Sequence, residues 1–128
     1  MKKTLLLVVL FMIVTGLTFC KKSVSVQERL IGKWKIDSVQ LRMSINNQIE
    51  YQTISKPSSD YYDFRTDNKL YRLWMNHYDT IPYSLVSLQG RSIVQYPVHS
   101  ADTILDLTSR SLIFKAPQGS DSKIFLSK

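Results

Sequence analysis

Two histidines are the first residues to test for chemistry, because each stands close to an aspartate. His77 precedes Asp79 by two positions, and His99 precedes Asp102 by three. A general base with its orienting acid, or part of a metal site, uses these residue types. A zinc site needs three or four ligands, however, and the chain holds two histidines and one cysteine. We therefore expect loop residues with local hydrogen bonds, with no metal and no catalytic base.

Other catalytic patterns are also missing. Ser100 follows His99, but it lacks the Gly-x-Ser-x-Gly segment that exposes a nucleophilic serine on a sharp turn. The four glycines are dispersed, so they form no loop that cradles a phosphate. Asp102 and Asp106 fall on one face of an expected strand, which we interpret as its solvent side. We expect no enzymatic activity and no cofactor.

Aromatic residues make up 11% of the chain and point to binding rather than to catalysis. A barrel of about eight strands is just wide enough to be filled by side chains or to hold one small ligand. The candidate ligand-binding residues, which we expect to alternate inward, are Tyr62, Phe64, Tyr71, Leu73, Tyr83 and Tyr96. A core filled by the same rings is the alternative. Trp74 falls on the face opposite Tyr71 and Leu73, where an outward ring would mark a partner surface or a membrane-facing patch.

Short strands must position these residues, because the chain alternates with a period of two and shows little helical periodicity. One short helical turn is expected over 26–31, just before Gly32. Turn signals occur at 46–47, 67–68 and 89–90. The expected strands cover 33–45, 49–53, 62–65, 71–75, 79–87, 94–98, 103–107, 112–114 and 123–127.

The first expected strand changes its apolar parity along its length. Trp34 and Ile36 share one face, whereas the apolar residues in 39–45 have the opposite parity. One extra residue near 37–38, a β-bulge, keeps both sets on the same side and bends the strand. A long bent first strand is typical of a sheet that curls into a barrel.

Most connections are of hairpin length, which favours an up-and-down meander whose closure removes exposed edges. The predicted fold is all-β: an eight- to nine-stranded up-and-down antiparallel barrel over residues 30–128. Pro82 indicates an edge or a bulge in the fifth strand. Residues 20–29 are expected to form a tether.

The net charge of +7 raises the question of a nucleic-acid partner. Lys2 and Lys3 supply two of these charges, and most of the other basic residues are spread singly along the chain. A run of basic residues that tracks phosphates is missing. We therefore expect no nucleic-acid partner.

The N-terminus is predicted to be an export signal, because Lys2 and Lys3 precede an uncharged, mainly apolar run over 4–19. This run is short for a membrane-spanning helix, which needs about 17–25 residues. The segment Leu17-Thr18-Phe19-Cys20 resembles the lipobox of bacterial lipoproteins. That resemblance implies a signal peptide over 1–19, cleavage before Cys20, a diacylglyceryl group on the thiol and often a further acyl chain, such as palmitate, on the new amine. Cleavage after Gly16 and an uncleaved signal anchor are the alternatives.

A lipid-bearing Cys20 implies membrane attachment, because two or more acyl chains anchor stably where one does not. The residues after the cysteine are basic, Lys21 and Lys22, and not the acidic residues that route some lipoproteins to the cell surface. The expected location is therefore the periplasmic side of a membrane in a bacterial envelope. With one cysteine, the chain has no internal disulfide, and packing must stabilise it.

The segment Leu30-Ile31-Gly32-Lys33-Trp34 resembles the Gly-x-Trp motif that begins the first strand of lipocalins. Residues 61–74 are similar to a hairpin of bacterial lipocalin-like domains, and 104–114 to their penultimate hairpin. The resemblance implies that Gly32 lets the entering chain turn and that Trp34 plugs the closed end of the barrel. It also implies an arginine over the tryptophan, for which Arg110 is a candidate.

Two functions follow from this reading. The first is a lipid-anchored module that binds a small apolar or amphipathic ligand. The second is a filled barrel that acts as a structural or protein-interaction module in the envelope. A cavity favours the first function, and a dry core with an apolar patch around Trp74 favours the second.

Overall fold

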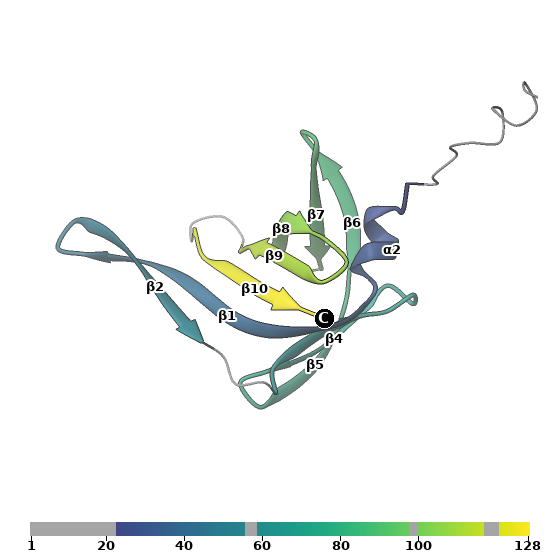
Figure 1. Ribbon diagram of the computed structural model, residues 1–128, viewed down its shortest axis with the longest axis horizontal. Helices are drawn as coiled ribbons and strands as arrows, with labels where there is room; N and C mark the ends of the chain where they lie inside the picture. Colours follow the sequence, from purple (N-terminus) through teal and green to yellow (C-terminus); the bar gives the residue numbers. More distant parts are fainter. Residues whose placement is uncertain (1–22, 56–58, 98–99, 117–120) are drawn as a thin grey trace, which may run out of the picture.

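The computed structural model describes residues 23–55, 59–97, 100–116 and 121–128. The expected signal peptide and Cys20 lie outside these residues. The described residues form one short helix and ten strands (Figure 1), which are α2 (Val26–Leu30), β1 (Gly32–Ile45), β2 (Gln48–Ser55), β3 (Tyr61–Phe64), β4 (Lys69–Trp74), β5 (His77–Pro82), β6 (Ser84–Leu88), β7 (Arg91–Tyr96), β8 (Ser100–Leu107), β9 (Ser111–Lys115) and β10 (Lys123–Ser127).

The strands form one antiparallel sheet that curls into a half-barrel (Figure 1). Their order is β5-β4-β3-β1-β10-β9-β8-β7-β6, and β2 pairs with β1 beside this path. Nearly all neighbours in the path are consecutive hairpin strands, while β1 lies between β3 and β10. The prediction of an all-β antiparallel fold is confirmed, and so is the short helix before Gly32.

A single residue, Tyr83, joins the two edge strands of this path. The strand expected over 79–87 is bent there into β5, which pairs with β4, and β6, which pairs with β7. The amide of Tyr83 donates to the carbonyl of Asn68 at 2.9 Å, and its hydroxyl donates to the carbonyl of Arg65 at 3.3 Å. Its ring meets Phe64 edge-on, with centroids 5.1 Å apart. Within the described residues, no strand pairing joins β5 to β6.

The predicted bulge in the first strand is present. The register between β1 and β10 shifts between Ile36 and Ser38. Because of this shift, Trp34, Ile36 and Val39 are all buried although their numbers differ in parity. The bulge therefore keeps the apolar side chains of β1 on the inner face.

The hydrophobic core lies on that inner face and is rich in aromatic rings. Phe64 and Phe114 are fully buried at its centre, 6.0 Å apart between ring centroids. The whole cluster consists of Leu30, Trp34, Ile36, Val39, Tyr62, Phe64, Leu70, Tyr83, Val94, Leu112, Phe114, Ile124 and Leu126. Rings thus fill one part of the half-barrel, as the filled-core alternative expects.

Three hairpins turn through two residues with positive φ. These pairs are Asn46 and Asn47 (51° and 62°), Met75 and Asn76 (50° and 63°), and Gln89 and Gly90 (51° and 75°). Two such residues make a type I′ turn, whose twist matches that of the strands. The turns predicted at 46–47 and 89–90 are confirmed, whereas the turn at 75–76 was not predicted.

Trp34 lies in the core beside α2. Its ring is fully buried, and its Nε1 donates to the carbonyl of Leu30 at 2.7 Å. The Nζ of Lys128 lies 4.2 Å from the centre of the Trp34 ring and donates to the carbonyls of Arg29 and Ile31. The cation over the tryptophan is therefore Lys128. The candidate Arg110 contributes only a backbone carbonyl, to the amide of Lys128.

Gly32 is required beside this cation for two reasons. Its φ of 124° is one that residues with a side chain rarely adopt. A Cβ at this position would also stand 3.1 Å from the Cε of Lys128. The chain therefore enters β1 through a conformation that only glycine adopts without strain.

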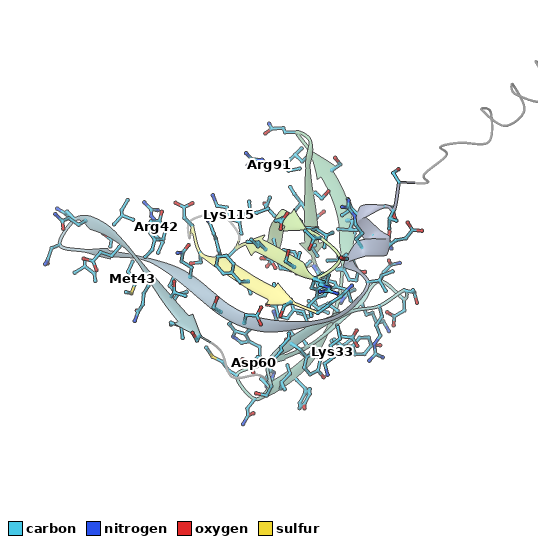
Figure 2. The ribbon with its side chains drawn as sticks, in the orientation of Figure 1. Lys33, Arg42, Met43, Asp60, Arg91 and Lys115 are labelled. Atoms are coloured by element: carbon cyan, nitrogen blue, oxygen red, sulfur yellow. The ribbon has the colours of Figure 1, made fainter. Side chains whose placement is uncertain are left out.

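Beyond Gln40, β1 and β2 form a two-stranded arm that extends from the half-barrel (Figure 1). Gln40 is the last residue of β1 that pairs with β10. Every residue of β2 is exposed, and Arg42 and Met43 lie on the arm (Figure 2). Among the described strands, β2 pairs with β1 alone. The expectation that closure removes all exposed edges is therefore wrong for this arm.

Candidate functional site

A hollow of about 450 Å³ opens on the inner side of the half-barrel, and we call it the inner hollow. Ligand sites typically occupy about 300–1,000 Å³, so a small molecule fits. Its lining combines three aromatic rings and aliphatic side chains with a few polar groups. The lining residues are Tyr62, Arg72, Trp74, Ile81, Tyr96, Pro97, Ser100, Asp102, Ala116 and Ile124.

Strand β4 turns Arg72 and Trp74 into the inner hollow, together with Leu70 in the core. The alternation of a strand then places Tyr71 and Leu73 on the outer face. The inward orientation expected for Tyr71 and Leu73, and the outward orientation expected for Trp74, are therefore both wrong. The reason is that β4 carries apolar residues on both faces, so its alternation does not identify the inner one.

Both outward residues of β4 have contacts of their own. Tyr71 donates its hydroxyl to Asp67 at 3.1 Å, and the guanidinium of Arg65 lies 4.1 Å from its ring centre. Leu73 is paired with Tyr61 on one side and Tyr78 on the other. These tyrosines explain why a leucine on the outer face is only 6% exposed.

Arg72 can face inward because Asp79 lies opposite it on β5. The guanidinium makes two hydrogen bonds of 2.8 Å to the carboxylate, from Nε to Oδ1 and from Nη2 to Oδ2. The hydrogen bonds to Asp79 raise the pKa of Arg72, so it stays charged. Both oxygens of Asp79 therefore accept hydrogen bonds from Arg72. A catalytic pair would require a hydrogen bond between Asp79 and His77.

Asp102 also faces the inner hollow, against expectation. It is paired with the core residue Val94 and is 7% exposed. The register between β8 and β9 shifts between Ile104 and Asp106, which moves Asp106 to the outer face. The prediction that Asp102 and Asp106 share the solvent side is therefore wrong, because a second bulge separates them.

Burial dominates the electrostatics of the inner hollow. Asp102 accepts a hydrogen bond of 2.9 Å from the hydroxyl of Tyr96. Burial nevertheless raises the pKa of Asp102, because desolvation penalises its charged form. Burial likewise raises the pKa of Tyr62 to about 12 and that of Tyr96 well above its ordinary value. Both tyrosines therefore keep their hydroxyl protons at neutral pH.

Of the six predicted ligand-binding residues, Tyr62 and Tyr96 line the inner hollow. Phe64 lies fully in the core. Tyr83 lines a neighbouring hollow of about 490 Å³ that shares Tyr96 and Pro97 with the first. The polar residues that the sequence interpretation missed are Arg72 and Asp102. A type I′ turn at 75–76 is the signal that would have placed Arg72 opposite Asp79.

Comparisons with family models, with curated proteins and with solved structures give no match for this chain. The geometry of the described residues therefore carries the functional argument.

No group of three or more metal-ligating side chains occurs in the part of the chain that the structure describes. His77 is exposed at the start of β5, and His99 lies outside the described residues. Within the described ranges, the helix is also too short to cross a membrane.

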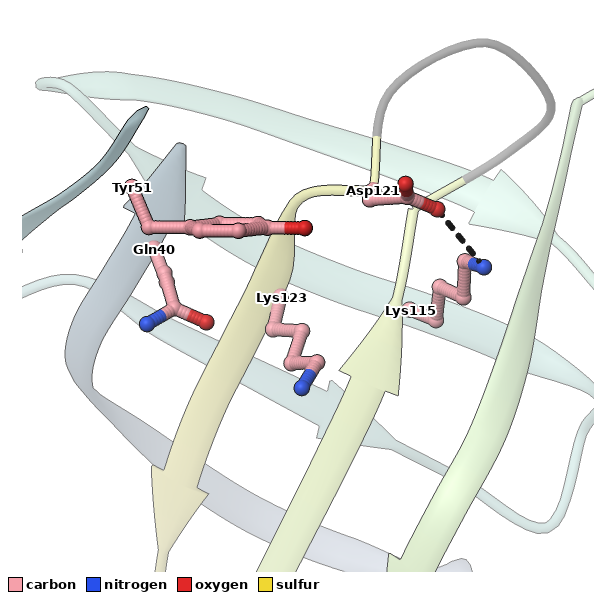
Figure 3. Close-up of a pocket in the computed structure, with 5 residues that line it drawn as sticks. All are labelled: Gln40, Tyr51, Lys115, Asp121 and Lys123. Atoms are coloured by element: carbon pink, nitrogen blue, oxygen red, sulfur yellow. Dashed lines mark ion pairs between the residues drawn. The ribbon is translucent and has the colours of Figure 1, made fainter. Parts of the chain in front are cut away.

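A second hollow, of about 440 Å³, lies where the arm meets the body of the sheet, and we call it the outer hollow (Figure 3). It is lined by Gln40, Tyr51, Lys115, Asp121 and Lys123. Asp121 binds Lys115 at 2.9 Å and Arg42 at 3.6 Å. Lys123 also acts on this carboxylate through its charge, so the described lining, with Lys115, Lys123 and Asp121, has a net positive charge.

Proposed function

We propose that this protein is a binding module that holds a small amphipathic molecule at a bacterial envelope. The observation that carries the proposal is the inner hollow of about 450 Å³. It combines rings and aliphatic walls with a few polar groups, which is the usual composition of a small-molecule site. No group of three or more metal-ligating side chains occurs among the described residues, and we take binding as the activity that this lining favours.

The hollow has distinct walls for the two ends of such a molecule. Trp74, Ile81 and Ile124 offer apolar surface, and each buried CH₂ of a ligand contributes ~0.8 kcal/mol. Tyr96 and Asp102 offer hydrogen-bonding groups that are already fixed by their bond to each other. Because these groups are already ordered, ligand binding costs less side-chain conformational entropy.

The fold and the N-terminus support a lipid-anchored, lipocalin-like module. Trp34 is buried and donates to the carbonyl of Leu30 in α2, and Gly32 leads the chain into β1, which supports a Gly-x-Trp motif. Acyl chains on Cys20 attach the protein to the membrane, and residues 20–29 connect the anchor to the half-barrel. In this proposal the protein stands on the periplasmic side of the membrane.

Mass spectrometry of the protein isolated from its own membranes tests the anchor. We expect the N-terminal peptide to begin at Cys20 and to carry the mass of a diacylglyceryl group. A peptide with an unmodified Cys20 still joined to Phe19 would contradict the lipoprotein proposal and leave the binding proposal standing.

Native mass spectrometry of the full chain tests the binding. We expect a discrete extra mass that is lost on unfolding. Ala116→Phe, which fills the inner hollow, should abolish that mass, whereas Ala101→Phe on the opposite face of β8 should retain it. A bare protein that also takes up no apolar or amphipathic compound would overturn the proposed function.

The arm supports a second candidate function, docking of an extended acidic segment of another envelope protein. β1 has a free edge beyond Gln40 among the described strands, because its pairing with β10 ends there, and such an edge accepts an added strand through its backbone. Arg42 on this part of β1, with Lys123 on β10 and Lys115 on β9 near its base, favours acidic side chains on that segment.

Two peptides separate this candidate from non-specific adhesion. A fluorescent peptide that alternates glutamate with valine should bind the full chain, and a lysine-valine peptide of equal length should not. Lys123→Glu should weaken binding, whereas Lys69→Glu on β4 should not. Equal binding of both peptides would reject the docking function.

A further inference from the structure

Three aromatic rings and one carboxylate meet in the inner hollow. Tyr62 on β3, Trp74 on β4 and Tyr96 on β7 line it together with Asp102 on β8. The rings of Tyr62 and Trp74 are 6.4 Å apart between centroids and inclined at 53°, so they present surfaces in different directions. Aromatic faces of this kind attract ammonium cations, and a neighbouring carboxylate adds a direct charge partner.

The charges around the inner hollow do not cancel. Arg72 uses two of its donors on Asp79, at 2.8 Å each, so this pair is neutral as a unit. Asp102 makes no ion pair with any lysine or arginine among the described residues. Its one hydrogen bond to a side chain comes from a neutral tyrosine hydroxyl. When Asp102 is ionised, the described charged groups at the hollow, Arg72, Asp79 and Asp102, therefore sum to one negative charge.

We propose that the inner hollow takes an amphipathic ligand whose polar end is an ammonium group. This inference rests on the proposed function and names the chemical class of its ligand. The ammonium group lies against Asp102 and the three rings, and the apolar chain lies along Ile81 and Ile124. A buried carboxylate without a cation is costly, so a cationic ligand removes a penalty that the free protein bears.

An anionic amphiphile such as a fatty acid fits this lining poorly. Its carboxylate would meet the like charges of Asp102 and Asp79, and like charges at short range oppose each other. Arg72 is the one cation among the described lining residues, and both oxygens of Asp79 already accept from it. Asp79 already balances the charge of Arg72, so an anion gains less from the remaining N–H donors of the guanidinium.

The acidity of Asp102 makes this recognition depend on pH. Its pKa is raised by burial and lowered in part by the Tyr96 hydroxyl and by Arg72. Asp79 and Tyr62 also face the hollow from β5 and β3, whereas Lys115 on β9 lies on the outer face. Since an ammonium group favours the ionised carboxylate, ligand affinity should rise as the pH rises through the pKa of Asp102.

The test uses the full chain in nanodiscs of phosphatidylglycerol, a lipid without an ammonium group. Tryptophan fluorescence is titrated with hexyltrimethylammonium, hexylammonium, hexanol and hexanoate. We expect the two cations to bind at least tenfold more tightly than hexanoate. Asp102→Asn should reduce cation affinity at least tenfold and change hexanol binding little. Asp106→Asn, on the outer face of the same strand, is the matched control and should have no effect.

The outcomes separate the ligand class from the function. Equal affinity for all four probes, or a preference for hexanoate, would overturn the ammonium inference and leave the proposed function intact. Failure of all four to bind would overturn the proposed function itself. Discs that contain phosphatidylethanolamine distinguish the source of the cation. If discs with phosphatidylethanolamine weaken the binding of hexylammonium, the natural ligand is a lipid headgroup. If they do not, it is a free amine. Either result supports an ammonium ligand.

Discussion

The ammonium group of Lys128 lies 4.2 Å from the centre of the Trp34 ring, where β10 ends beside the beginning of β1. It also donates to the carbonyls of Arg29 at 3.2 Å and Ile31 at 2.9 Å. These carbonyls belong to the segment that leads out of α2 into β1. One side chain therefore joins the helix, the first strand and the last strand at this end of the half-barrel.

Replacing Lys128 should loosen this end. Lys128→Met keeps the aliphatic stem but removes the cation–π contact and both hydrogen bonds, so we expect a loss of about 1–2 kcal/mol in the free energy of unfolding. Lys69→Met, at an exposed site on β4, is the control. Urea unfolding measures both variants. Equal stability of the two would show that the Lys128 cation contributes nothing.

Gly32→Ala should destabilise the same end by about 1–3 kcal/mol, because it forces a side chain into a strained backbone region. Part of the effect should come from the approach of the new Cβ to Lys128. Gly90→Ala is the milder comparison, since its φ of 75° is close to the left-handed region that other residues enter and nothing stands within 4 Å of its Cβ position. Thermal unfolding should place Gly32→Ala well below Gly90→Ala. Closely similar melting temperatures would show that neither the φ of Gly32 nor the approach to Lys128 matters.

The Arg72–Asp79 pair should show measurable coupling. A double-mutant cycle with Arg72→Met and Asp79→Leu should give an interaction energy of about 1–2 kcal/mol, because the two bonds are charge-assisted and partly buried. The Arg65–Asp63 pair is the reference, because its arginine side chain is 55% exposed and solvent screens it more. A coupling no larger than that of the reference pair would place Arg72 in solvent rather than in the lining.

Stability should depend on pH through Asp102. Its pKa in the folded protein is raised above the ordinary 3.8, so the folded state holds the proton more tightly than the unfolded state does. The resulting stabilisation is complete below the ordinary pKa and is lost as the pH rises through the folded pKa. Asp102→Asn removes this dependence. Unfolding free energies measured from about pH 4 upward should therefore fall more steeply in the parent protein than in Asp102→Asn.

Asp106→Asn should retain the steep profile of the parent protein. Parallel profiles for the parent and Asp102→Asn would mean that Asp102 is solvated in the folded state.

Local patterns made much of the fold predictable. The parity change in β1 indicated the bulge near Ser38, because a buried face must stay continuous along a strand. Asn46-Asn47 and Gln89-Gly90 indicated their turns, because these residues tolerate positive φ. Such features depend on neighbours in the sequence, which a single chain displays directly.

The inner hollow was harder to predict because its residues depend on distant partners. An arginine in a strand is expected to face solvent unless a partner such as Asp79 lies opposite it. That pairing follows from the turn at Met75, and methionine rarely adopts a positive φ. The sequence predicts Asp102 to be a surface residue, because the alternation of polar and apolar residues does not reveal the bulge between Ile104 and Asp106. The position of Lys128 over Trp34 depends on the closure of the whole sheet.

The connection at Tyr83 has a consequence for the local opening of the sheet. Only the backbone of Tyr83 connects the edge strands β5 and β6, and these strands do not pair with each other in the described structure. The sheet can therefore widen between them without breaking a strand pairing. Amide groups of β5 and β6 that face this seam should exchange their hydrogens with solvent faster than those of β9 and β10. The two neighbouring hollows share Tyr96 and Pro97, so widening at Tyr83 would change the shape of both at once.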